Sequence, residues 1–156
     1  MMYNDILNHL PYKSSFRFVD HISSLDADGV IGEYTLREES FFYADHFPGN
    51  PVTPGVILTE IMAQIGLVTL GIFLVAQRSE GCSFPTGSAL FPLLTSTEVS
   101  FHKMVLPGET VIVQSRKQYF RFGKLKCVVT MTNKNGEAIA RGIFSGVIKQ
   151  INLPSA

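Results

Sequence analysis

The longest hydrophobic segment of the chain runs from Val56 to Ala76, with the sequence VILTEIMAQIGLVTLGIFLVA. Glu60 and Gln64 interrupt it near its start, and the uninterrupted apolar run that follows spans only residues 65–76. A membrane-spanning helix needs about 20 predominantly apolar residues, whereas a helix that is apolar on nearly every side can be the buried axis of a globular fold. We therefore expect a buried helix and no membrane span. Glu60 and Gln64 should share one face of it, because they are four residues apart.

The start of this helix is marked by Thr53 and Pro54. Threonine can accept a hydrogen bond from a free backbone N–H group as the N-cap, and proline suits the first helical position because its φ angle is already fixed. The preceding segment, FPGNPVTPG, contains three prolines and two glycines. We expect a stiff loop there, which has little conformational entropy left to lose.

Alternation of apolar and polar residues with a period of two predicts strands in the rest of the chain. The clearest case is Val30, Tyr34 and Leu36, which alternate with polar side chains. Other strands are expected near residues 16–22, 97–104, 110–122, 124–133 and 137–150. A loop rich in Gly, Ser and Pro is expected from Gln77 to Pro92. Residues 133–136 (NKNG) predict a hairpin turn, because Asn and Gly tolerate positive φ angles.

One long apolar helix and about six strands, most of them after the helix, predict an α+β architecture in which an antiparallel sheet wraps around a central helix. The length of 156 residues fits a single domain, residues 1–156. The edges of such a sheet are usually covered by pairing with another chain, so we expect a dimer.

The composition narrows the class of protein. Apolar residues make up 46% of the chain and charged residues 17%, which excludes a disordered chain. Thirteen basic residues balance 13 acidic ones, and no basic run occurs, which argues against a nucleic-acid partner. Cys82 and Cys127 are too few for a disulfide framework and lack metal-ligand spacing. Since the N-terminus also lacks the pattern of a secretory signal, we expect a cytoplasmic protein without a metal site.

Basic residues gather on one predicted hairpin: Arg116, Lys117, Arg121, Lys124 and Lys126. Two interpretations are open. The residues can form a solvated face of the hairpin, or they can form a surface that attracts an acidic partner.

Three residues in segment 45–64 (DHFPGNPVTPGVILTEIMAQ) suggest chemistry. His46 lies in the stiff loop, Glu60 lies in the apolar helix, and Gly55 offers a backbone N–H group near the helix start that no Cβ obstructs. Burial raises the pKa of a carboxyl group, which is what a general acid needs near neutral pH. Each residue also has a purely structural interpretation. His46 can be an ordinary loop histidine, Glu60 can form a hydrogen bond to a loop amide, and Gly55 can simply mark the start of the helix.

The same segment resembles the signature of the 3-hydroxyacyl-[acyl-carrier-protein] dehydratases, the FabZ/FabA group with the hot-dog fold. In that family the catalytic histidine opens an HFPG-x-P-x-x-PG-V motif, and its acidic partner follows 14 residues later in an E-x-M-A-Q motif. Those positions are His46 and Glu60 here. The similarity continues in SSFRFVDHI and in VSFHKMVLPGETV, and it spans about residues 16–148. Glutamate at position 60 places the chain closer to FabZ than to FabA.

The resemblance implies a dehydration that yields trans-2-enoyl thioesters, with His46 as the base at C2 and Glu60 as the acid at the C3 hydroxyl. It implies that the Gly55 N–H polarises the thioester carbonyl and that the Val52 carbonyl holds the second ring nitrogen of His46. Gln64 is either a support for Glu60 or a packing residue. No cofactor is implied beyond the phosphopantetheine arm of an acyl carrier protein, which carries the substrate. Two subunits would share each site, in a homodimer or a trimer of dimers.

Some features depart from the family pattern or leave alternatives open. Asp45 stands where glycine usually precedes the histidine, and the loop from about Arg78 to Leu94 is longer than usual. Alternatives are a hot-dog acyl thioesterase and a non-catalytic acyl-binding subunit. The product could serve fatty-acid or polyene pigment synthesis, and acyl chain length and an isomerase side activity stay open.

Overall fold

The computed structural model describes residues 3–79 and 88–152. Its central helix has three consecutive parts, which are α2 (Gly55–Ala63), the π-helical segment η2 (Gln64–Thr69) and α3 (Leu70–Arg78). This helix is long and apolar enough to cross a membrane, yet 78% of its most hydrophobic window is buried inside the fold. The prediction of a buried central helix is confirmed.

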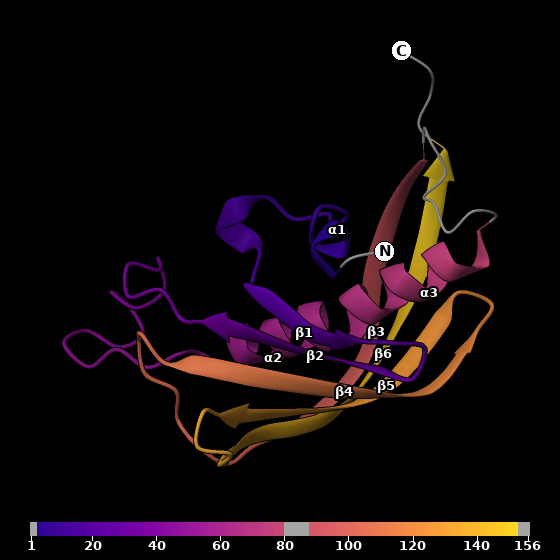
Figure 1. Ribbon diagram of the computed structural model, residues 1–156. Coiled ribbons are helices and arrows are strands. Elements are labelled where there is room, and N and C mark those ends of the chain that lie inside the picture. The colour runs from indigo at the N-terminus through magenta and orange to yellow at the C-terminus, as the bar shows by residue number, and fades with distance from the viewer. Residues whose placement is uncertain (1–2, 80–87, 153–156) are drawn as a thin grey trace.

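A six-stranded sheet surrounds the helix, with the order β1-β2-β4-β5-β6-β3 and antiparallel pairing throughout. The strands are β1 (His21–Leu25), β2 (Gly29–Thr35), β3 (Ser88–Phe101), β4 (Thr110–Arg121), β5 (Lys124–Asn133) and β6 (Ala138–Asn152). Figure 1 shows the helix lying in the curve of this sheet, while β3 and β6 continue past it as a two-stranded ribbon. This is the hot-dog fold, and it confirms the expected α+β class.

The N-terminal segment covers the helix on the side away from β4 and β5 (Figure 1). It contains the short helix α1 (Tyr3–Leu7) and the 3₁₀ turn η1 (Ser14–Phe16). Ile6, Leu10 and Phe18 bury their side chains in the same core as the central helix. The helix is therefore enclosed by the sheet on one side and by this segment on the other.

The strand predicted at residues 16–22 is wrong over residues 16–20, because β1 begins only at His21. At Phe16 and Phe18 the backbone bonds to a side chain instead of a neighbouring strand. Phe18 N–H donates to Gln64 Oε1 (2.7 Å), and Gln64 Nε2 donates to the carbonyl of Phe16 (2.8 Å). Alternation in the sequence cannot reveal that a helix residue replaces a strand partner.

The loop predicted from Gln77 to Pro92 is also wrong at both ends. Helix α3 continues to Arg78, and β3 begins at Ser88, so the strand expected at 97–104 starts nine residues earlier and ends at Phe101. Residues 80–87 of this loop lie outside the described part of the chain. Pro92 is tolerated in β3 because β3 is an edge strand, where one side of the backbone needs no strand partner.

The predicted N-cap is wrong as well. The helix begins at Gly55 with Pro54 in the cap position, and no side chain caps it. The Thr53 hydroxyl is bonded to the Tyr43 hydroxyl instead (2.5 Å). The turn at residues 133–136 is confirmed: Asn133 Oδ1 accepts from two backbone N–H groups, and Gly136 has a φ angle of 80°.

Candidate active site

His46 lies in a loop whose backbone is bonded at several points. Its N–H donates to the carbonyl of Phe42 (3.0 Å), and its own carbonyl accepts from Val52 N–H (2.9 Å). The His46 Nδ1 atom lies 2.8 Å from the Val52 carbonyl oxygen. A carbonyl only accepts, so Nδ1 carries a proton and donates, which leaves Nε2 as the nitrogen free to accept one.

The Gly55 pocket lies beside this loop, at the N-terminus of the central helix. It has a volume of about 310 Å³ and is lined by Val52, Thr53, Gly55, Leu58, Phe101, His102, Lys103 and Met104. The N–H groups in the first turn of a helix have no partner within the helix, and the helix dipole places a partial positive charge there. This end can therefore stabilise negative charge that develops on a carbonyl oxygen.

Glu60 lies on α2, and its side chain is half-buried. Burial raises the pKa of its carboxyl group, and the hydrogen bond from Gln64 partly offsets this rise. A carboxyl group in such surroundings keeps its proton to higher pH than an exposed one, which favours its use as a proton donor.

Gln64 holds Glu60 in place and is itself fully buried. Its Nε2 donates to Glu60 Oε1 (2.9 Å) as well as to the Phe16 carbonyl, while its Oε1 accepts from Phe18 N–H. The shared helical face expected for Glu60 and Gln64 is confirmed. One amide therefore joins the carboxyl group, the helix and the N-terminal segment.

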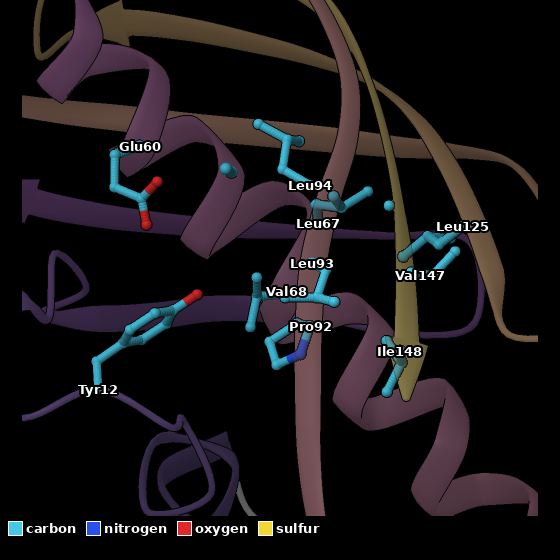
Figure 2. A pocket seen from close by; sticks show the side chains of 12 residues that line it. Tyr12, Glu60, Leu67, Val68, Pro92, Leu93, Leu94, Leu125, Val147 and Ile148 are labelled. Carbon is cyan, nitrogen blue, oxygen red and sulfur yellow. The ribbon is translucent and has the colours of Figure 1, made fainter. Parts of the chain in front are cut away.

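Glu60 also lines a cavity, hereafter the Glu60 cavity, of about 170 Å³. Figure 2 shows it extending from Glu60 and Tyr12 toward Leu125 and Ile148. Apart from these two polar groups its wall is apolar: Ala63, Leu67, Val68, Pro92, Leu93, Leu94, Leu125, Gly146, Val147 and Ile148. The apolar wall can hold a hydrocarbon chain, and a polar group attached to that chain could then lie beside the Glu60 carboxyl group.

The predicted site residues fall into two groups. His46, Val52 and Gly55 lie at or beside the Gly55 pocket, whereas Glu60 and Gln64 lie at the Glu60 cavity. Within the described part of one chain, no hydrogen bond or ion pair joins His46 to Glu60. Among the same residues, no group of three or more His, Cys, Asp or Glu side chains is placed to hold a metal ion.

Sequence analysis did not identify Tyr12 as part of this region. It lines the Glu60 cavity together with Glu60, and its hydroxyl is directed into the cavity (Figure 2). Tyr12 precedes Glu60 by almost 50 residues in a segment without a chemical motif, so only the folded structure brings them together.

Comparison with known proteins agrees with the fold and the motif. The FabA-like domain matches residues 10–143. The chain is 31% identical over 134 residues to the 3-hydroxyacyl-[acyl-carrier-protein] dehydratase FabZ of Wolbachia pipientis subsp. Culex pipiens, covering 82% of this chain and 85% of that protein. It is 33% identical over 113 residues to the bifunctional enzyme LpxC/FabZ of Porphyromonas gingivalis, covering 72% of this chain but only 22% of that longer enzyme.

Among solved structures, a chain of the dehydratase heterocomplex ApeI:P from Xenorhabdus doucetiae superposes with a TM-score of 0.73. The match covers 92% of this chain and 90% of that one at 14% identity, which shows a shared fold and no more. Taken with the match over residues 10–143, these findings show that the chain belongs to the FabA-like family of hot-dog proteins and is similar to FabZ dehydratases.

Proposed function

We propose that this protein is a 3-hydroxyacyl-[acyl-carrier-protein] dehydratase that removes water from 3-hydroxyacyl thioesters to give trans-2-enoyl thioesters. The observation that carries the proposal is the half-buried Glu60 carboxyl group, which Gln64 orients at the polar end of an apolar cavity. The similarity to FabZ enzymes supports the same reaction class.

In the proposed reaction, His46 Nε2 takes a proton from C2 of the substrate, and the electron pair of that C–H bond forms the C2=C3 double bond. The C3–O bond breaks, its electron pair goes to oxygen, and the Glu60 proton completes a water molecule. His46 ends protonated and Glu60 ionised, and exchange with solvent restores both. Because hydroxide is a poor leaving group, the raised pKa of Glu60 suits this role.

The Gly55 N–H group would bind the thioester carbonyl oxygen, on which negative charge develops as the C2 proton leaves. A single donor of this kind typically lowers the barrier by ~3–4 kcal/mol. The Val52 carbonyl, bonded to Nδ1, would keep the imidazole in the tautomer that leaves Nε2 free.

We propose further that a second copy of the chain completes each site, in a homodimer or a trimer of dimers. Large apolar side chains around the Gly55 pocket are exposed, among them Met104 (69%), Val56 (76%) and Phe101 (47%). Among the described strands, β3 also lies at one edge of the sheet, where only β6 pairs with it. A partner that covers these surfaces could bring its own Glu60 cavity next to His46, which the single chain does not do.

The carrier protein is proposed to dock at the end of the β4–β5 hairpin. Lys117 is engaged within the chain, because it pairs with Asp28 (3.8 Å). Arg121 and Lys124 are exposed beside Leu125, which lines the Glu60 cavity. Lys124→Glu should raise KM for a carrier-bound substrate more than for a free thioester. Lys134→Glu, in the turn between β5 and β6, should leave both KM values unchanged. Equal effects of Lys124→Glu on both substrates would contradict this docking site.

The reaction is reversible, so the function can be tested by adding a trans-2-enoyl thioester and following the loss of its conjugated absorbance. The wild type should hydrate it, and His46→Ala and Glu60→Gln should not. Release of free thiol without hydration would indicate a thioesterase. An unchanged substrate at several chain lengths, carrier-bound forms included, would indicate a non-catalytic acyl-binding protein. We place the protein in the cytoplasm, serving fatty-acid or polyene synthesis.

A further inference from the structure

Two polar side chains line the Glu60 cavity. Of the described residues that line it, only Glu60 and Tyr12 carry polar side-chain atoms, and Figure 2 shows the Tyr12 hydroxyl directed into the cavity on the side where the Glu60 carboxyl group lies. Among the hydrogen bonds of the described residues, none joins the two groups directly; Glu60 is bonded to Gln64 instead. The phenol and the carboxyl group thus lie on the walls of one cavity without contacting each other.

The positions of the two groups are linked through one residue. Gln64 donates to Glu60 Oε1 and also to the Phe16 carbonyl, so it ties the N-terminal segment to the helix. The Tyr12 ring packs against the Phe16 ring, with 6.1 Å between their centroids. Tyr12 is therefore held relative to Glu60 by the same amide that orients the carboxyl group.

We propose that Tyr12 is a further catalytic residue: its hydroxyl donates a hydrogen bond to the C3 oxygen of the substrate, opposite Glu60, and holds that oxygen as it leaves as water. This inference rests on the proposed dehydratase function. The C3 oxygen is the one polar group of the acyl chain beyond the thioester, and it would lie where the cavity has its two polar side chains.

A phenol suits this task because it remains a donor throughout the reaction. Burial raises the pKa of the Tyr12 hydroxyl, and the nearby Glu60 carboxylate raises it further. Tyr12 therefore keeps its own proton, and only Glu60 transfers one. The hydrogen bond would stabilise the negative charge that builds up on the oxygen while the C3–O bond breaks.

The test uses two substrates with the same acyl chain, a 3-hydroxyacyl thioester and a 3-chloroacyl thioester. Chloride leaves with the C3–Cl electron pair and needs no proton. Its elimination therefore requires His46 but neither Glu60, which protonates the C3 oxygen, nor Tyr12, which holds it. Tyr12→Phe should lower kcat for the hydroxy substrate roughly 10- to 100-fold, with little change in KM. The same variant should eliminate chloride within about twofold of the wild-type rate.

Three further variants make the result specific. Glu60→Gln should show the same pattern as Tyr12→Phe, and His46→Ala should lose both reactions. Tyr34→Phe, which removes a hydroxyl from another buried tyrosine away from this cavity, should lose neither. If Tyr12→Phe keeps full activity on the hydroxy substrate, or loses both eliminations equally, the proposed role of Tyr12 is wrong. A wild type inactive on both substrates would instead overturn the dehydratase function itself.

Discussion

The two parts of the proposed active site, the Glu60 cavity and the Gly55 pocket, differ in how much of each is formed by a single chain. The Glu60 cavity is more closed to solvent than the Gly55 pocket, and its carboxyl group is held by the fully buried Gln64 amide, which also bonds to the backbone of Phe16 and Phe18. The Gly55 pocket has a fixed backbone too, but its rim is made of exposed side chains such as Met104 and Phe101. The proposed acid is held entirely within one chain, whereas the proposed base lies beside exposed apolar side chains that the proposed partner would cover.

This difference has a physical reason. A carboxyl group on a buried helix must be compensated within the fold, since an uncompensated one costs several kcal/mol. A histidine in an exposed loop needs only its tautomer fixed, which the Val52 carbonyl provides. A single chain must therefore supply the groups that surround Glu60, whereas a second subunit can supply some of those that surround His46.

The largest expected effect comes from removing either reacting group. His46→Ala and Glu60→Gln should each lower the rate of enoyl hydration by roughly 10²- to 10⁴-fold, because proton transfer by a positioned side chain contributes about that much. Initial rates with a free thioester measure this. Glu39→Gln, which changes an exposed carboxyl group that lines neither the Glu60 cavity nor the Gly55 pocket, is the matched control and should leave the rate unchanged. Retained activity in either site variant would contradict its assigned role.

Gln64→Leu should give the next largest effect, this time on stability. It removes the bonds to Phe16 and Phe18 and leaves buried backbone groups unpaired, which should lower the free energy of unfolding by about 2–4 kcal/mol. Thr69→Val removes a single bond to the Gln64 carbonyl and should cost only about 1 kcal/mol. Urea denaturation distinguishes the two. Equal costs would mean that Gln64 does not tie the N-terminal segment to the helix.

A smaller effect is expected at the apolar end of the Glu60 cavity. A Cβ atom added at Gly71 would meet Ile148 Cδ1, so Gly71→Ala should push this side chain into the cavity. Activity on long acyl chains should fall by roughly tenfold relative to short ones, as expected for a few displaced methylene contacts. Adding Ile148→Val should restore long-chain activity.

Gly66→Ala provides the control for that series. Its added Cβ would meet Val129, which does not line the cavity, so it should reduce stability without changing the chain-length preference. A uniform loss at all chain lengths in Gly71→Ala would show that the apolar end does not hold the acyl chain.

The smallest effect concerns the pH dependence of stability. The pKa of Glu60 is raised in the folded state. Its contribution to the free energy of unfolding is therefore fully present below about pH 4.5 and is lost as pH rises through the raised pKa. Relative to Glu60→Gln, the wild type should therefore lose stability as pH increases. Glu137 gives the opposite sign, because Lys103 lowers its pKa and its contribution is lost as pH falls. Denaturation across about pH 2.5 to 8 checks both slopes, because the Glu137 slope lies below its ordinary pKa. Parallel curves for wild type and Glu60→Gln would contradict the raised pKa.

Much of this arrangement could be predicted from the sequence because it depends on local pattern. The apolar run of the central helix, the spacing of Glu60 and Gln64, and the turn at residues 133–136 all follow from periodicity or turn chemistry. The motif around His46 and Glu60 also identified the family.

What could not be predicted depends on contacts between distant segments. The Gln64 side chain takes the place of a strand partner for Phe18, which delays the start of β1. Pairing with β6 extends β3 through a Pro- and Ser-containing segment that looked like a loop. Tyr12 lines the same cavity as Glu60 only because the N-terminal segment folds over the helix.

The most direct test of the central claim is complementation between two inactive variants. His46→Ala and Glu60→Gln would be purified, mixed, unfolded together and refolded, and enoyl hydration would be measured beside wild type treated in the same way. If His46 of one chain works with Glu60 of another, half of the dimers are mixed and each has one intact site, so about a quarter of the wild-type activity should return. If the mixture stays inactive while refolded wild type is active, the two halves of the site do not come from different chains.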